Sequence, residues 1–142
     1  MFFTIRVDFL FSQCYTVFIK IRSVQEEDMI IRKIKSLLEA DVLCGEEYLD
    51  EEVNYAFSSD MMSDVLAYAE EQSLLLTSLC NPQVIRTAEM LDILCIVFVR
   101  GKYPDPNMLK LAEERGIVIL ATSRGMFTTC GLLYSNGLLG GA

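Results

Sequence analysis

The stretch "LCIVFVRGKYPDPNMLKLAEERGIVILATS", residues 94–123, decides the fold that the sequence predicts. Its first six residues are apolar, and such a run is typical of a strand buried on both faces. The loop at 100–106 holds two prolines and a glycine, which end one element and start the next. A helix at 107–116, closed by a glycine, leads to a second apolar strand at 117–121. Strand, helix and strand in this order predict a βαβ crossover and two parallel strands.

The same alternation extends to both sides of this stretch. Apolar residues recur at helical spacing in 30–38, and Asn81 followed by Pro82 is a helix start. The apolar run at 73–78 reads as a buried strand, although a buried helical turn fits the same pattern. The remaining predicted elements are strands near 42–44 and 53–57, helices within 60–71 and 82–93, and a last helix within 126–137 that glycines interrupt or end. The fold class is therefore α/β, with a mostly parallel sheet of about five short strands, flanked by helices and built from βαβ units.

Composition limits the size of the protein and the partners it can have. The 142 residues, 52% hydrophobic and 23% charged, suffice for one soluble globular domain. A net charge of -8 without a dense run of Lys or Arg argues against nucleic acid or an anionic membrane as partner. The chain has no His, which removes the usual general base, the commonest zinc ligand and the Ser-His or Cys-His nucleophile pairs. We therefore expect no enzyme, no catalytic residue, no metal and no cofactor.

The number and spacing of the cysteines indicate a reducing cytoplasm and do not indicate a metal site. They stand at positions 14, 44, 80, 95 and 130, without a CxxC pair, and four of them lie in or beside apolar segments. An odd number of thiols without a secretory signal indicates a reducing cytoplasm. The spacing is not that of a zinc or iron-sulfur site.

Residues 1–28 differ in amino-acid composition from the rest of the chain. Charges interrupt their apolar run before it reaches the length of a membrane span, and no signal-peptide cleavage site follows. One reading is an extra N-terminal strand or hairpin. The favoured reading is a mis-assigned start, with translation beginning at Met29, because residues 25–28 can be encoded by a purine-rich bacterial ribosome-binding sequence. The domain then covers 29–138, and residues 139–142 are expected to form a frayed tail.

Candidate binding residues follow the predicted strands, because ligands of open α/β sheets bind outside the carboxyl ends of the strands. The candidates are Ser58, Ser59, Thr77, Ser78, Asn81, Arg100, Gly101, Thr122, Ser123 and Arg124. Hydroxyls, two arginines and free N–H groups at helix starts suit an anion such as a phosphate. The alternative reading is that the hydroxyls and amide cap helices or form turns, and that the arginines are solvated or ion-paired.

Asp60 and Asp64, four residues apart, form the carboxylate pair that most resembles a metal or catalytic site. In a helix starting near Ser59, Asp60 lies in the first turn, where its charge favours the helix dipole, and Asp64 follows one turn later. Two carboxylates alone supply too few oxygens for a metal. If the strand-to-helix loops converge, we expect Ser58 and Ser59 to be better ligand candidates than either aspartate; if they do not, the stretch is a capped helix.

The segment from about Val42 to Leu138 resembles the DRTGG domain, through "VLCGEEYLDEEV", "SDMMSDVLAYA", "LLLTS", "NPQVIRTAEMLDILCIVFVRG", "PDPNMLKLAEERGIVILATS" and "FTTCGLLY". That domain is related to the N-terminal domain of bacterial HPr kinase/phosphorylase and occurs in phosphate acetyltransferases and CBS-domain pyrophosphatases. The resemblance implies an α/β regulatory or interaction module, often dimeric. Where many relatives have a Thr-Gly-Gly turn, this chain has Val99-Arg100-Gly101, and the Asp-Arg signature is represented only by Ser63-Asp64.

Two functions are compatible with these observations. The first is a stand-alone regulatory domain that senses a small phosphorylated ligand, such as a nucleotide, at the strand-to-helix loops. Because the chain has no phosphate-transfer motif, a bound nucleotide would be sensed and not hydrolysed. The alternative is a protein-interaction module that acts in trans on a partner enzyme or signalling protein, with no small ligand. A homodimer is compatible with either function.

Overall fold

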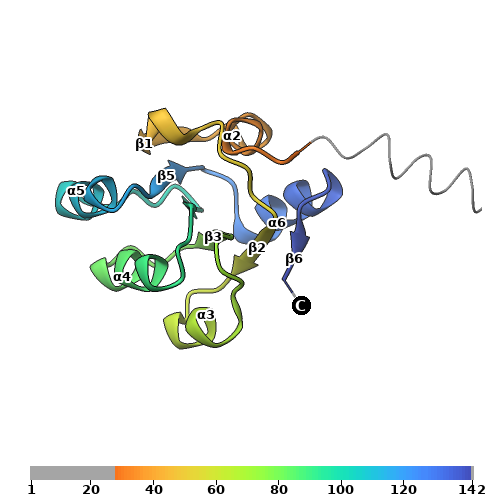
Figure 1. Ribbon diagram of the computed structural model, residues 1–142. Helices are drawn as coiled ribbons and strands as arrows, with labels where there is room; N and C mark the ends of the chain where they lie inside the picture. Colours follow the sequence, from red (N-terminus) through yellow and green to blue (C-terminus); the bar gives the residue numbers. More distant parts are fainter. Residues whose placement is uncertain (1–27, 142) are drawn as a thin grey trace, which may run out of the picture.

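The computed structural model describes residues 28–141, which form one six-stranded sheet with helices on both faces (Figure 1). The prediction made for residues 1–28 therefore lies, except for Asp28, outside the described residues. The strands are β1 (Asp41–Cys44), β2 (Tyr55–Ser58), β3 (Leu74–Thr77), β4 (Cys95–Phe98), β5 (Val118–Ala121) and β6 (Leu139–Gly140). The helices are α2 (Ile31–Leu38), α3 (Met62–Tyr68), α4 (Pro82–Met90), α5 (Pro106–Glu114) and α6 (Met126–Ser135), with a short 3-10 turn, η1 (Glu46–Tyr48).

The strand order in the sheet is β1-β5-β4-β3-β2-β6. Strands β2, β3, β4 and β5 are parallel to one another, β6 runs parallel to β2, and β1 is antiparallel to β5. The expected α/β fold with a mostly parallel sheet is therefore confirmed. Each parallel step is made through a helix, as the βαβ pattern of 94–123 predicts.

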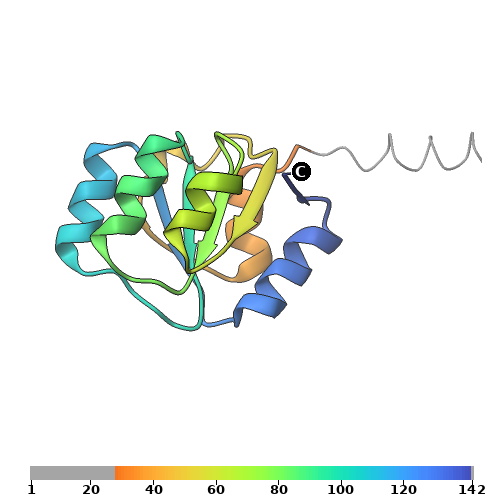
Figure 2. The ribbon, with the colours of Figure 1, turned by 90° about the horizontal axis from the view of Figure 1, so that it is seen from below.

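Helices on both faces explain why the central strands are apolar throughout. All four residues of β3, β4 and β5 are buried. Helices α2 and α6 pack on one face, where Ile34 and Leu133 meet the alternate strand residues. Helices α3, α4 and α5 lie side by side on the other face (Figure 2), where Val65 and Met108 contribute to a second cluster around Phe98. A strand that is covered on both faces has no side exposed to water, so its residues can be apolar throughout. The run at 73–78 has this pattern, and it contains β3.

The sequence predicts the start of one helix correctly and the start of another wrongly. Asn81 accepts a hydrogen bond from the Gln83 N–H at 3.0 Å, with Pro82 as the first helical residue, so this predicted cap is confirmed. The helix expected to start near Ser59 instead begins at Met62. Residues 59–61 form a turn in place of a first helical turn, because Asp60 bonds to the neighbouring strand and does not cap its own helix.

The two edges of the sheet are closed by features that the sequence patterns only partly indicate. At one edge Gly45, with φ of 84°, follows β1, and a Cβ there would lie 2.9 Å from the Val118 Cα. Glycine is therefore required for β1 to approach β5. At the other edge the frayed tail expected for 139–142 is wrong for its first two residues, because Leu139 and Gly140 pair with Tyr55 and Ala56 of β2.

Candidate functional site

The carboxyl ends of β2, β3, β4 and β5 lie along one edge of the sheet, because these strands are parallel. We call the loops that leave them the rim. The rim consists of Ser58–Asp60, Thr77–Asn81, Arg100–Gly101 and Thr122–Arg124. All ten candidate binding residues lie on it, and hydrogen bonds join its loops in two neighbouring pairs.

The first pair of loops is held together by the Asp60 carboxylate. Its Oδ1 accepts hydrogen bonds from the Thr77 hydroxyl at 2.9 Å and from the Ser78 N–H at 2.7 Å. Its Oδ2 accepts from the Ser78 hydroxyl at 2.6 Å. Thr77 is buried, and its hydroxyl oxygen also accepts from the Leu79 N–H at 3.2 Å. The carboxylate thus satisfies a buried hydroxyl and fixes the start of the β3 loop.

The ionised form of Asp60 is favoured by these contacts. Partial burial by itself raises the pKa of the carboxyl group, but the hydrogen bonds from Ser78 and Thr77 and the positive charge of Arg100 outweigh it. The resulting pKa of Asp60 lies below its usual range. The positive charge of Arg100 thus acts on Asp60, although the two residues belong to different loop pairs.

The second pair of loops is joined through the backbone. The Arg100 N–H donates to the Arg124 carbonyl at 2.8 Å, and the Gly101 N–H donates to the Thr122 carbonyl at 2.9 Å. Both residues of this turn are left-handed, with φ of 59° at Arg100 and 67° at Gly101. Glycine adopts this conformation readily, whereas an arginine does so at a steric cost. The turn therefore carries an exposed arginine at a position whose backbone suits glycine.

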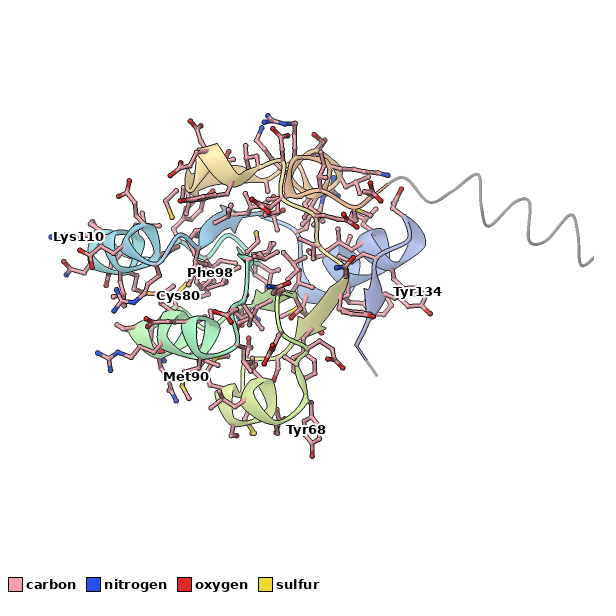
Figure 3. All side chains as sticks on the ribbon, in the orientation of Figure 1. Tyr68, Cys80, Met90, Phe98, Lys110 and Tyr134 are labelled. Carbon is pink, nitrogen blue, oxygen red and sulfur yellow. The ribbon has the colours of Figure 1, made fainter. Side chains whose placement is uncertain are left out.

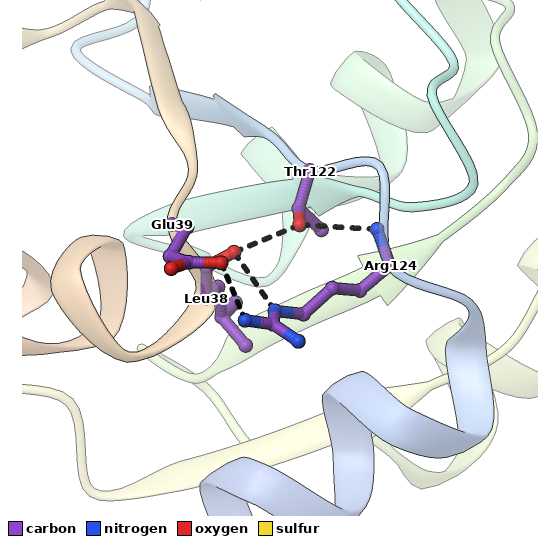
Figure 4. Close-up of polar contacts among 4 residues, drawn as sticks. All are labelled: Leu38, Glu39, Thr122 and Arg124. Carbon is purple, nitrogen blue, oxygen red and sulfur yellow. Dashed lines mark hydrogen bonds and ion pairs between the residues drawn. The ribbon is translucent and has the colours of Figure 1, made fainter.

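Arg124, the other candidate arginine, is held by the protein itself. Its Nε donates to the Leu38 carbonyl at 3.3 Å and its Nη2 to a Glu39 carboxylate oxygen at 2.6 Å (Figure 4). The Thr122 hydroxyl donates to the same Leu38 carbonyl at 2.9 Å and accepts from the Arg124 N–H at 3.3 Å. These groups close the carboxyl end of α2 against the β5 loop. Arg124 and Thr122 thus have structural partners.

The remaining candidate residues are either hydrogen-bonded within the chain or exposed on the rim. The Ser59 hydroxyl accepts from the Met61 N–H at 3.0 Å and shapes the turn before α3. Asn81 is committed to capping α4. Ser58 and Ser123 are exposed on the rim. Of the candidates, Ser58, Arg100, Gly101 and Ser123 thus present the most accessible groups.

Asp60 joins two loops of the rim, whereas the expectation placed it in the first turn of a helix. That Ser58 and Ser59 are better ligand candidates than the aspartates stays a prediction. A signal was available: an aspartate that directly follows one strand, and a Thr-Ser pair that ends the next, meet when the two strands are parallel neighbours.

No group of three or more His, Cys, Asp or Glu side chains that could hold a metal occurs within residues 28–141. The four described cysteines, Cys44, Cys80, Cys95 and Cys130, are unpaired thiols. Burial raises the pKa of Cys95 most strongly, and it raises those of Cys44 and Cys80 as well, so these thiols are poor nucleophiles. Among the described helices, none is both long and apolar enough to cross a membrane.

Comparisons with known proteins agree with this architecture. A model of the DRTGG domain family matches residues 33–135, which confirms the resemblance. A similar solved structure holds the CBS and DRTGG domains of the regulatory region of Clostridium perfringens pyrophosphatase, complexed with its activator diadenosine tetraphosphate. The TM-score is 0.59 at 16% identity, over 72% of this chain and 45% of that one, so the chain spans less than half of that structure. No curated protein sequence matches the chain.

Proposed function

The chain belongs to the DRTGG domain family, and from this premise we propose that it is a regulatory domain without catalytic activity, whose rim binds a small phosphorylated ligand. A nucleotide is the first ligand class to test. The proposed binding residues are the exposed ones of the rim, with Arg100 as the principal charged contact and Ser58, Gly101 and Ser123 beside it. The four cysteines that the structure describes are unpaired thiols, which supports a place in the reducing cytoplasm.

The observation that carries the proposal is the state of the two rim arginines. Arg124 is engaged by the Leu38 carbonyl and by Glu39, so its charge is largely compensated. Arg100 is exposed, and its backbone is fixed by the bond to the Arg124 carbonyl. Guanidinium groups bind phosphate oxygens through two parallel hydrogen bonds, and a fixed loop reduces the entropy lost on binding. The rim therefore offers one preorganised cation to an anionic ligand.

The similar regulatory region supports a nucleotide as the first ligand to test. Its structure contains diadenosine tetraphosphate, an anionic dinucleotide, as activator of that pyrophosphatase. That region also contains CBS domains, and this chain covers 45% of its length. Diadenosine tetraphosphate is therefore a candidate ligand for the rim.

Thermal unfolding in the presence of nucleotides tests the proposal. We expect AMP, ATP, GTP or diadenosine tetraphosphate at millimolar concentration, with and without Mg²⁺, to raise the melting temperature of the full chain. A ligand at 100 times its Kd stabilises a protein by about 2.7 kcal/mol, which such a scan resolves. Arg100→Ala should abolish the shift.

Arg86 provides the matched control for this experiment. It is an exposed arginine within α4, away from the loops of the rim, so Arg86→Ala removes the same charge elsewhere. The Arg86 variant should keep the full ligand response. Absence of a shift with every nucleotide, or equal losses in both variants, would contradict the proposed rim site.

A protein-interaction role without a ligand is the second candidate, and one specific feature favours it. Phe127, in the first turn of α6, is 92% exposed, more than any other large hydrophobic residue of the described chain. An aromatic ring in this position suits a contact with another protein surface.

A further inference from the structure

A groove opens beside α6, on the face of the sheet that α2 and α6 cover. It has a volume of about 170 Å³ and lies between α6 and β2. Its apolar walls include Ala56, Leu76, Leu133 and Leu138. An apolar cavity of about 150 Å³ is large enough to bind benzene. The groove can therefore take a flat ring of about that size.

Ser58 belongs both to the groove and to the rim. It is the last residue of β2, and it lines the groove. Ala56 packs against the core cluster under α6, and residues two apart on a strand face the same side, so the side chain of Ser58 lies on this face as well. Ser58 is exposed at the point where the groove meets the strand-to-helix loops. A ligand held at the rim can thus reach into the groove past this one residue.

Arg100 and Ser58 are close enough to contact the two ends of one small ligand. They follow β4 and end β2, with only β3 between these strands. Neighbouring strands are about 4.8 Å apart, so the two strand ends are separated by about 10 Å. The positive charge of Arg100 helps to lower the pKa of Asp60, in the loop that follows Ser58, and so it acts toward β2. A nucleoside monophosphate spans a comparable distance from its phosphate to the far edge of its base.

The groove lacks the charge that the rest of the surface carries. The chain has a net charge of -8, but no Asp, Glu, Lys or Arg lines the groove. A charged group buried there would lose its hydration without an opposite charge to replace it. A neutral ring meets no such cost. The groove and Arg100 together therefore suit a ligand with a neutral ring at one end and an anionic group at the other.

Tyr134 gives the groove an aromatic wall. The side chain lines the groove and is 67% exposed. Figure 3 shows it at the β6 edge of the molecule, at the opposite end from Lys110 of α5. Nucleobases stack on aromatic side chains, and every base has the π-face that this contact needs. The wall favours a flat heterocycle over an aliphatic chain.

We infer that the groove between α6 and β2 binds the base of a nucleotide whose phosphate is bound by Arg100, with Ser58 at the junction. The inference rests on the proposed function of the rim. It adds a source of specificity, because the rim alone does not distinguish a nucleotide from any other phosphorylated small molecule.

AMP and ribose 5-phosphate test the inference, because they share the sugar and the phosphate and differ in the base. Isothermal titration calorimetry of the full chain should give AMP a Kd at least about tenfold lower than that of ribose 5-phosphate. Cys130→Phe places a ring in the groove wall and should remove this preference. Gly131→Phe is the matched control. A Cβ on Gly131 meets nothing within 4 Å, so the same ring lies outside the groove and the preference should persist.

The thiol of Cys130 provides a readout in the unaltered chain. It lines the groove and is half-buried. AMP at about ten times its Kd should slow the alkylation of this thiol by N-ethylmaleimide about tenfold, because only the unoccupied fraction reacts. Ribose 5-phosphate should leave the rate unchanged. Cys44 is the control, since it is also half-buried but lies in β1, at the opposite edge of the sheet. Peptide mass spectrometry measures both rates.

Three results would overturn the inference while the rim proposal stands. AMP could bind no tighter than ribose 5-phosphate, Cys130→Phe could keep the preference for AMP, or AMP could leave the alkylation of Cys130 unchanged. In each case a thermal shift with a nucleotide that Arg100→Ala abolishes would still support binding at the rim. Absence of a shift with every nucleotide would overturn both. If Cys130→Phe does not fold, the protection of Cys130 in the wild-type chain decides the matter.

Discussion

Asp60 and Ser78 are joined by two hydrogen bonds, one from the Ser78 N–H to Oδ1 at 2.7 Å and one from its hydroxyl to Oδ2 at 2.6 Å. Both oxygens of one side chain thereby hold the first residue after the neighbouring strand. The relationship turns two separate strand-to-helix loops into one rigid unit at the carboxyl edge of the sheet.

Asp60→Ala should lower the free energy of unfolding by about 2 kcal/mol, measured by urea denaturation at pH 7. The substitution removes the acceptor of the buried Thr77 hydroxyl and of the Ser78 N–H. Asp64→Ala is the matched control, because it removes the neighbouring carboxylate from the first turn of α3. Its cost should stay below about 1 kcal/mol, the usual size of a helix-dipole contribution. Equal costs would show that the Asp60 contacts do not stabilise the fold.

The contribution of Asp60 should disappear in acid. Its folded pKa is depressed, because bonds from Ser78 and Thr77 and the charge of Arg100 outweigh the effect of burial. A depressed folded pKa gives stability that is present above the unfolded value, about 3.9, and is lost as the pH falls through the folded value. The difference in unfolding free energy between wild type and Asp60→Ala should thus shrink below about pH 4. A difference that grows on acidification would contradict this sign.

Arg100→Gly should stabilise the fold while it removes the proposed ligand contact. The residue has φ of 59°, a conformation that costs an L-residue about 1 kcal/mol and costs glycine little. The melting temperature without ligand should therefore rise, and the shift on adding nucleotide should vanish. A variant that loses both stability and the ligand response would indicate instead that the arginine supports the loop itself.

Arg124→Ala should lower the stability of the fold and leave the ligand response intact, which is the opposite of the result expected for Arg100→Gly. It removes the bond to the Leu38 carbonyl and the ion pair with Glu39, and should cost about 1–2 kcal/mol of unfolding free energy. Any ligand-induced shift should persist, because this guanidinium is already occupied. Glu39→Ala is the control for the ion pair alone and should cost less than about 1 kcal/mol, since Glu39 is largely exposed. Loss of the ligand response in Arg124→Ala would assign it to the binding site.

The fold could be predicted from the sequence because its strands are buried on both faces. Continuous apolar runs such as 94–99, separated by helices with clear caps, leave few arrangements other than a covered parallel sheet. The position of the rim follows as well, because the carboxyl ends of parallel strands meet at one edge of the sheet. The parallel sheet follows from continuous apolar runs, and the cap at Asn81 follows from the proline next to it in the sequence.

What could not be predicted depends on contacts between distant residues. The start of α3 moved from Ser59 to Met62 because Asp60 bonds to Ser78, 18 residues away. The strand at Leu139 and Gly140 exists because β2 offers it an edge, and two residues carry no pattern of their own. The roles of the two arginines diverge because Glu39 lies 85 residues before Arg124.

The two outermost strands restrict how this sheet can associate. At one edge, β1 shifts register between Val42 and Cys44, which interrupts its ladder with β5. At the other edge, β6 is only two residues long. Short or irregular outer strands present few aligned backbone groups for another strand to pair with, which protects against aggregation. Further copies cannot readily extend the sheet, and assembly is left to side-chain surfaces, where a single substitution can tune or abolish it.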